Sequence, residues 1–132
     1  MDRLFLDANV LFSAAYRPDA GLHQLWKLKD VALYSSQYAL EEARINLAHE
    51  DQRRRLRRLS ETVHLVEAMQ RELPVGISLP EKDVPIMLAA IEAQCTHLLA
   101  GDVRHFGPYF GKKIEAVAIV LPGEYLRGRA GV

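Results

Sequence analysis

Hydrophobic residues fall in short continuous runs along the chain, separated by polar and turn-forming residues. The first run, RLFLD at 3–7, ends in an aspartate, and the second, VALYSS at 31–36, ends in two serines that can cap a helix. Continuous apolar runs of this length are typical of strands buried on both faces. The segments 9–15 and 22–28 between them are short helical candidates, separated by the turn-forming sequence RPDAG.

The middle of the chain has a helical pattern. Apolar residues recur at helical spacing in two consecutive segments, with Leu40, Ala43 and Leu47 in the first and Leu56, Leu59, Val63, Val66 and Leu73 in the second. This period predicts helix from Tyr38 to Leu73, with a break at 49–51. A third strand is expected at 75–78, directly after Pro74.

The last third of the chain returns to alternating elements. Asp83 and Pro85 are start signals for a helix, and apolar runs at 96–101 and 117–122 predict a fourth and a fifth strand. Strands that alternate with helices indicate a parallel sheet covered on both faces. The pattern therefore predicts an α/β fold with a five-stranded parallel sheet, formed by residues 1–132 as one domain.

Composition is that of a soluble globular protein. Hydrophobic residues make up 49% of the 132 residues and charged residues 26%, which excludes disordered, collagen-like and disulfide-rich classes. The single cysteine, Cys95, cannot form an internal disulfide and is expected to be buried. No apolar run is long enough to cross a membrane, and residues 1–20 lack the basic-then-apolar layout of a signal peptide, so a cytoplasmic location without membrane contact is expected.

Four carboxylates occupy positions that a parallel sheet brings together. Asp7 and Asp102 follow predicted strands, Glu42 lies about one turn into the helix after the second strand, and Asp83 opens a later helix. Ligands of open α/β sheets sit outside the carboxyl ends of the strands. We therefore expect these four side chains to meet at one edge, although each has an ordinary alternative as a helix cap, a turn residue or, for Glu42, an exposed helix residue like Glu41.

Such an acidic group would bind a metal. Carboxylates close together repel one another unless protons or a cation neutralise them. Oxygen ligands favour a hard divalent ion, Mg²⁺ or Mn²⁺, which keeps several of its waters. A hydrated divalent ion on an acidic edge suits hydrolysis of a phosphodiester, because it activates a bound water and stabilises charge on the phosphate oxygens.

Three segments resemble the motifs of PIN-domain nucleases. LFLDANVLFSA is similar to the opening motif, in which an aspartate ends the first strand and Asn9 follows two residues later. SSQYALEEARINL resembles the helix that carries the family's glutamate, here placed on Glu42. KDVPIMLAAIEAQCTHLLAGDVRHF resembles the C-terminal signature, with Asp83 opening a helix and Asp102 after the next strand. Ala100 stands where the family commonly has Thr or Ser.

The resemblance implies a fold and an activity. It implies a Rossmann-like α/β/α sandwich, one or two divalent metals held by the four carboxylates, and endonucleolytic cleavage of RNA that leaves a 5′-phosphate. It also implies the toxin of a bacterial toxin–antitoxin pair, of the VapC type, with an antitoxin protein as partner. The resemblance also implies a homodimer. The apolar side chains of Leu22, Leu25 and Trp26 favour one too, because they exceed what is needed to cover a five-stranded sheet.

Two other protein classes have an aspartate after the first strand or on an acidic edge, and the sequence fits neither. A haloacid-dehalogenase phosphatase needs a second aspartate where Asn9 stands, and a receiver domain needs an acidic pair that the sequence lacks. The arginine run, Arg53, Arg54, Arg55, Arg57 and Arg58, is either a solvated helix face or a set of phosphate contacts. Because Ala100 replaces a polar residue, a catalytically degraded PIN-like protein-binding module is the alternative to the nuclease.

Overall fold

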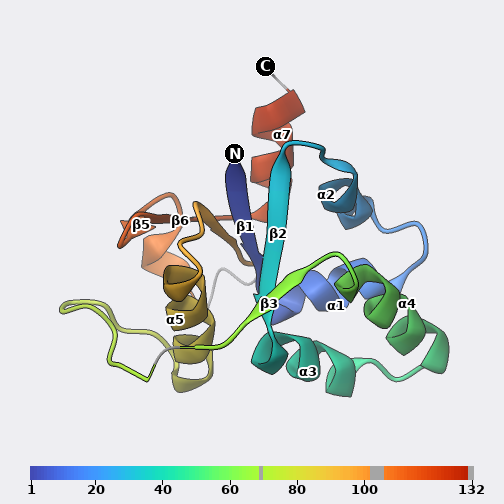
Figure 1. Ribbon diagram of the computed structural model, residues 1–132, viewed down its shortest axis with the longest axis horizontal. Coiled ribbons are helices and arrows are strands. Elements are labelled where there is room, and N and C mark those ends of the chain that lie inside the picture. The colour runs from blue at the N-terminus through green and yellow to red at the C-terminus, as the bar shows by residue number, and fades with distance from the viewer. Residues whose placement is uncertain (69, 102–105, 131–132) are drawn as a thin grey trace.

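The computed structural model describes residues 1–68, 70–101 and 106–130, and within them the chain forms a mixed sheet flanked by helices (Figure 1). Six strands lie in the order β3-β2-β1-β4-β6-β5. Their bounds are Asp2–Leu6 (β1), Val31–Ser36 (β2), His64–Val66 (β3), His97–Leu99 (β4), Lys113–Ile114 (β5) and Val117–Val120 (β6). All neighbouring strands run parallel except β5, which is antiparallel to β6.

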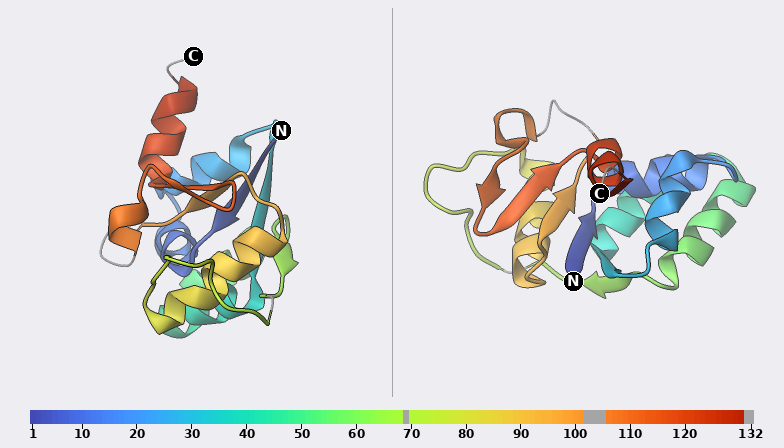
Figure 2. Two further views of the ribbon diagram at one scale, coloured as in Figure 1. Left: turned by 90° about the vertical axis from the view of Figure 1, so that its left-hand side faces the viewer. Right: turned by 90° about the horizontal axis from the view of Figure 1, so that it is seen from above.

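Helices cover both faces of this sheet. They are α1 (Ala8–Tyr16), α2 (Gln24–Lys27), α3 (Gln37–Asn46), α4 (Glu50–Ser60), α5 (Val84–Glu92) and α7 (Pro122–Ala130), with short 3-10 turns at Gly21–His23 (η1), Glu81–Asp83 (η2) and Gly107–Tyr109 (η3). Figure 2 shows α5 on one face and α1, α2 and α4 on the other, while α3 lies at the carboxyl end of the strands. The predicted α/β class is confirmed, and the layers are compatible with a Rossmann-like α/β/α arrangement.

β1 lies at the centre of the sheet because its apolar run can be buried on both faces. Leu4, Phe5 and Leu6 are completely buried, and β1 pairs with β2 on one side and β4 on the other. Burying side chains of this size stabilises the fold by roughly 2 kcal/mol each. The core of β1 and β4 thus fixes the edge at which both strands end.

The third strand is not where the sequence pattern placed it. The apolar period predicts helix as far as Leu73, but α4 ends at Ser60, and the third strand is His64–Val66. The predicted strand at 75–78 is a turn instead, because Ile77 N donates to the carbonyl of Pro74 at 3.1 Å and Gly76 takes a φ of +87°. A three-residue edge strand is too short to break a helical period visibly.

The sheet also has one strand more than predicted. β5 and β6 form a hairpin, in which Ile114 pairs with Val117 and only Glu115 and Ala116 form the turn. Both turn residues have positive φ, 45° and 72°, as a type I′ turn requires. Such turns are usually signalled by Asn-Gly, and the sequence Glu-Ala does not predict one.

This turn stores backbone strain that a glycine would relieve. Ala116→Gly should raise the free energy of unfolding by about 1 kcal/mol, because left-handed backbone costs L-residues about that much. Chemical denaturation would measure the change. Ala118→Gly, two residues later within β6, is the matched control and should lower the free energy of unfolding. Equal destabilisation by both substitutions would contradict the assignment of the turn.

Candidate functional site

Asp7 is the first residue after β1 and is held rigidly at the carboxyl edge of the sheet. Its amide N donates to the carbonyl of Leu99 in β4 at 3.1 Å, and its Oδ1 accepts from Ala8 N at 2.7 Å as the cap of α1. The side chain is 4% exposed. Strand pairing and helix capping therefore fix an almost completely buried carboxylate at this edge.

Asp83 ends η2 and precedes α5, and it is also 4% exposed. Its N donates to the carbonyl of Pro80 at 2.9 Å, which closes the η2 turn. The alternative role suggested by the sequence was a helix cap, but the Asp83 side chain makes no capping hydrogen bond with α5. Its burial is thus not explained by capping.

The glutamates of α3 point in different directions. Ala39 and Ala43 are buried and set the inner face of α3, next to which Glu42 is half-buried. Glu41 is exposed and accepts a hydrogen bond from Arg44 Nε at 3.0 Å within an ion pair along the helix surface. The helix phase therefore turns Glu42, rather than Glu41, toward the buried aspartates.

The pKa of Asp7 shows that these carboxylates act on one another. It is raised from its usual 3.8 to about 7, mainly because burial removes water from the charged form. The negative charges of Asp83 and Glu42 raise this pKa further, whereas the Ala8 amide and the charge of Lys82 lower it. Asp7, Asp83 and Glu42 thus lie within electrostatic reach at one edge of the sheet.

Tyr38 is a residue of this edge that the sequence pattern did not reveal. It is the second residue of α3, 42% exposed, and its hydroxyl donates to the carbonyl of Lys82 at 2.9 Å. Partial burial and then the charges of Glu42, Asp83 and Asp7 raise its pKa. Its place just after β2 was the available signal, but an exposed tyrosine at a helix start has no distinctive pattern.

Asn9 lies beside the end of β4. A methyl group added at Gly101 would lie 3.6 Å from Cβ of Asn9, so the start of α1 and the residues after β4 are neighbours. Ala100, where a polar residue was expected from the resemblance, is buried. The fourth predicted carboxylate, Asp102, lies outside the described residues.

The carboxylates at this edge are the right type of ligand for a hard divalent cation, but too few of them come together within the described residues to form a complete site. Carboxylate oxygens are the ligands that Mg²⁺ and Mn²⁺ prefer, and a cation would remove the cost of ionising the buried Asp7. Within residues 1–68, 70–101 and 106–130, however, no three His, Cys, Asp or Glu side chains form a group that could hold a metal. A hard divalent cation bound by so few carboxylates would keep several of its own waters.

The arginine run is partly used for packing. Arg55 Nη1 donates to the carbonyl of Ala15 at 2.6 Å and so joins α4 to α1, and Arg53 Nη1 lies 4.0 Å from Glu50 in the same helix. Contacts between this run and phosphates therefore stay a prediction, and they would involve only its exposed members.

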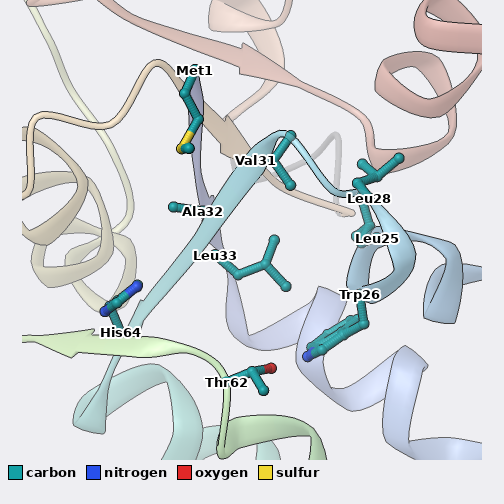
Figure 3. Close-up of a pocket in the computed structure, with 9 residues that line it drawn as sticks. All are labelled: Met1, Leu25, Trp26, Leu28, Val31, Ala32, Leu33, Thr62 and His64. Atoms are coloured by element: carbon teal, nitrogen blue, oxygen red, sulfur yellow. The ribbon is translucent and has the colours of Figure 1, made fainter.

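An apolar hollow of about 420 Å³ lies beside the first half of β2, away from the carboxyl edge (Figure 3). Leu25 and Trp26 line it, but Leu25 is completely buried and Trp26 donates from Nε1 to the carbonyl of Leu59 at 2.9 Å. Leu22 is half-buried against the same core. These three side chains thus pack within one chain, which weakens the apolar-excess argument for a dimer.

Comparisons with known proteins add no family. No protein-family model matches the chain, and no curated protein matches it. No helix in the described part of the chain has both the length and the apolar character needed to cross a membrane. The geometry of the carboxyl edge is therefore the basis on which a function can be argued.

Proposed function

We propose that this protein is a PIN-type endoribonuclease that hydrolyses RNA phosphodiester bonds with a divalent metal ion. The observation that carries the proposal is Asp7, a buried carboxylate whose pKa is raised to about 7 by burial and by the neighbouring charges of Asp83 and Glu42. Ionising a buried carboxyl group lowers the free energy of unfolding, so such a group makes the fold less stable unless a cation or a proton neutralises it. Strongly shifted groups of this kind are characteristic of functional sites.

Asp7, Asp83, Glu42 and Asp102 would hold Mg²⁺ or Mn²⁺ at the carboxyl edge. An ion held there would supply a water of lowered pKa and would neutralise charge on the phosphate oxygens. Asp7 and Asp83 are fixed by the ends of β1 and η2, so they give a rigid pair of acceptors. Glu42 is half-buried and can reach solvent, where it can accept a proton from a water.

Two further features of the chain have a place in this proposal. Asn9 lies beside Gly101 at the same edge and can donate its amide hydrogens to a carboxylate or to a phosphate oxygen. Asp7 follows β1, Glu42 lies in α3 and Asp83 precedes α5, and side chains on such elements are held more precisely than side chains on loops.

The partners follow from the same proposal. We propose that the enzyme acts in the cytoplasm as the toxin of a toxin–antitoxin pair, is held inactive by an antitoxin protein, and forms a homodimer. These partners are proposed on the resemblance of the sequence motifs to those of VapC-type toxins.

One observation favours the second candidate, a protein-binding module with a degraded site. Within the described residues, no three potential ligands form a metal-holding group, and the buried Ala100 brings no polar atom to the end of β4. In that case Asp7 would be kept neutral by a proton, as its raised pKa permits.

Metal binding separates these two candidates. Millimolar Mn²⁺ should raise the melting temperature at pH 8 by several degrees, because a ligand that binds only the native state stabilises it. The rise should shrink at pH 6, since the raised pKa of Asp7 means that the ion must then displace a proton. Thermal melting by circular dichroism at both pH values measures this.

The same samples test the activity. Wild-type protein with Mn²⁺ should cleave single-stranded RNA into fragments with 5′-phosphates, and excess chelator should stop the reaction. Equal concentrations of Na₂SO₄ in place of MnCl₂ control for ionic strength. If Mn²⁺ does not change the melting temperature and the RNA stays intact, the nuclease proposal fails and the protein-binding module takes its place.

A further inference from the structure

A second hollow opens next to the carboxylates. It has a volume of about 230 Å³ and lies where β2 and β3 end and α3 begins, lined by Ser36, Gln37, Tyr38, Val66, Glu67 and Ala68. Val66 and Ala68 are half-buried and apolar, whereas Gln37, Tyr38 and Glu67 are exposed. The hollow thus combines an apolar surface, one aromatic ring and two hydrogen-bonding side chains.

Tyr38 connects this hollow with the carboxylates. Its ring lines the hollow, and its hydroxyl is fixed at 2.9 Å to the carbonyl of Lys82, the residue before Asp83. It also lies within electrostatic reach of Glu42 and Asp7, as described above. A ligand in the hollow would therefore contact Tyr38, whose hydroxyl is bonded to the residue before Asp83.

The tyrosine has the properties of a stacking platform. An exposed aromatic ring of 42% relative accessibility is costly to leave in water, and here the hydrogen bond to Lys82 limits its rotation. Proteins recognise unpaired RNA bases by stacking them on such rings and by hydrogen bonds to their edges. Stacking alone accepts any base, because every base has a flat face.

The polar side chains of the hollow differ in the hydrogen bonds that they can make. The carboxylate of Glu67 only accepts hydrogen bonds, and the amide of Gln37 can donate one. Guanine presents two adjacent donors, N1–H and the N2 amine, beside the acceptor O6. Adenine and cytosine offer a single amino group as donor. Uracil has a carbonyl oxygen on each side of its N3–H, and a carboxylate repels these two oxygens.

We propose that this hollow is a nucleobase subsite that holds an unpaired guanine next to the cleaved phosphodiester, stacked on Tyr38 and read by Glu67 and Gln37. This inference rests on the proposed nuclease function and extends it to a substrate class, single-stranded RNA containing guanine. The carboxylates act on the phosphate, and the hollow selects the base beside it.

Binding is measured separately from cleavage on the Asp7→Asn background, with Mn²⁺ and fluorescently labelled uridine oligomers that carry one guanine, inosine or adenine. Guanine should bind roughly 5- to 150-fold tighter than inosine, which lacks the N2 amine, as for other bidentate base contacts. Glu67→Gln should reduce this ratio to about twofold or less, because its amide offers a donor where guanine needs an acceptor. Glu72→Gln, an exposed glutamate of the same loop, is the matched control.

Tyr38 variants test the stacking. Tyr38→Ala should weaken binding of every oligomer roughly 5- to 150-fold while keeping the order of bases. Tyr38→Phe keeps the ring and should bind almost as the parent does, which shows that loss of folding is not the cause. Tyr16→Ala removes a comparably exposed tyrosine on α1 and should change nothing.

The outcomes separate this inference from the nuclease itself. Cleavage next to guanine, lost in Glu67→Gln, supports both. Cleavage without base preference, or a Tyr38→Ala protein that binds like Tyr16→Ala, overturns the subsite and leaves the nuclease standing. If the wild type binds guanine selectively but cleaves no RNA, the subsite is supported and the nuclease proposal fails.

Discussion

Asp7→Asn should make the metal-free protein more stable at pH 8, by on the order of 4 kcal/mol, and leave its stability near pH 4 unchanged. The pKa of Asp7 is about 7 in the folded protein and near its usual 3.8 in the unfolded chain. Between these values the folded protein binds the additional proton. The stability of the wild type therefore falls as pH rises from about 4 to about 7 and is level above that.

The asparagine removes this dependence without removing the helix cap. Asn is as good a cap as Asp, and its Oδ1 can still accept from Ala8 N, so the start of α1 is kept. Chemical denaturation from pH 4 to pH 8 in excess chelator measures both curves. Asp19→Asn, an exposed aspartate after α1, should follow the wild-type curve. Parallel curves for Asp7→Asn and wild type would show that Asp7 ionises without cost.

The sequence predicts the parts of this fold whose burial is continuous. β1 and β4 are short apolar runs with Leu4–Leu6 and Leu98–Leu99 completely buried, so the hydrophobic pattern alone locates them. β3 and β5 have three and two residues, and His64 and Leu65 are exposed. Such strands exist because a neighbouring strand offers hydrogen bonds, and a pattern of burial cannot reveal them.

The candidate site shows the same division. Asp7 and Asp83 were placed by strand ends and helix starts, and the structure buries both at the carboxyl edge. The choice between Glu41 and Glu42 depended on the rotation of α3, which the burial of Ala39 sets. Tyr38 escaped prediction because its hydroxyl is held by Lys82, 44 residues away. Long-range contacts of single side chains leave no periodic trace in the sequence.

Substitutions of the carboxylates should separate a metal site from a merely acidic edge. If the proposed metal site exists, Asp7→Asn, Asp83→Asn and Asp102→Asn should each reduce Mn²⁺-dependent RNA cleavage by on the order of 100-fold or more, because each would remove a charged ligand from a site that acts by electrostatic stabilisation. Glu42→Gln should cause a similar loss. Steady-state cleavage of a labelled single-stranded RNA at pH 8, with Mn²⁺ varied, measures these changes.

Glu41→Gln is the internal control for this series, since Glu41 is adjacent in sequence but forms an exposed ion pair with Arg44. Exposed pairs contribute at most about 1 kcal/mol, so this variant should fold and cleave like the wild type. If the four site variants bind Mn²⁺ more weakly and cleave poorly while Glu41→Gln does neither, the four carboxylates act together. If Glu41→Gln loses as much activity as Glu42→Gln, or if Asp7→Asn cleaves normally, the metal site is wrongly placed, and the proposed mechanism fails with it.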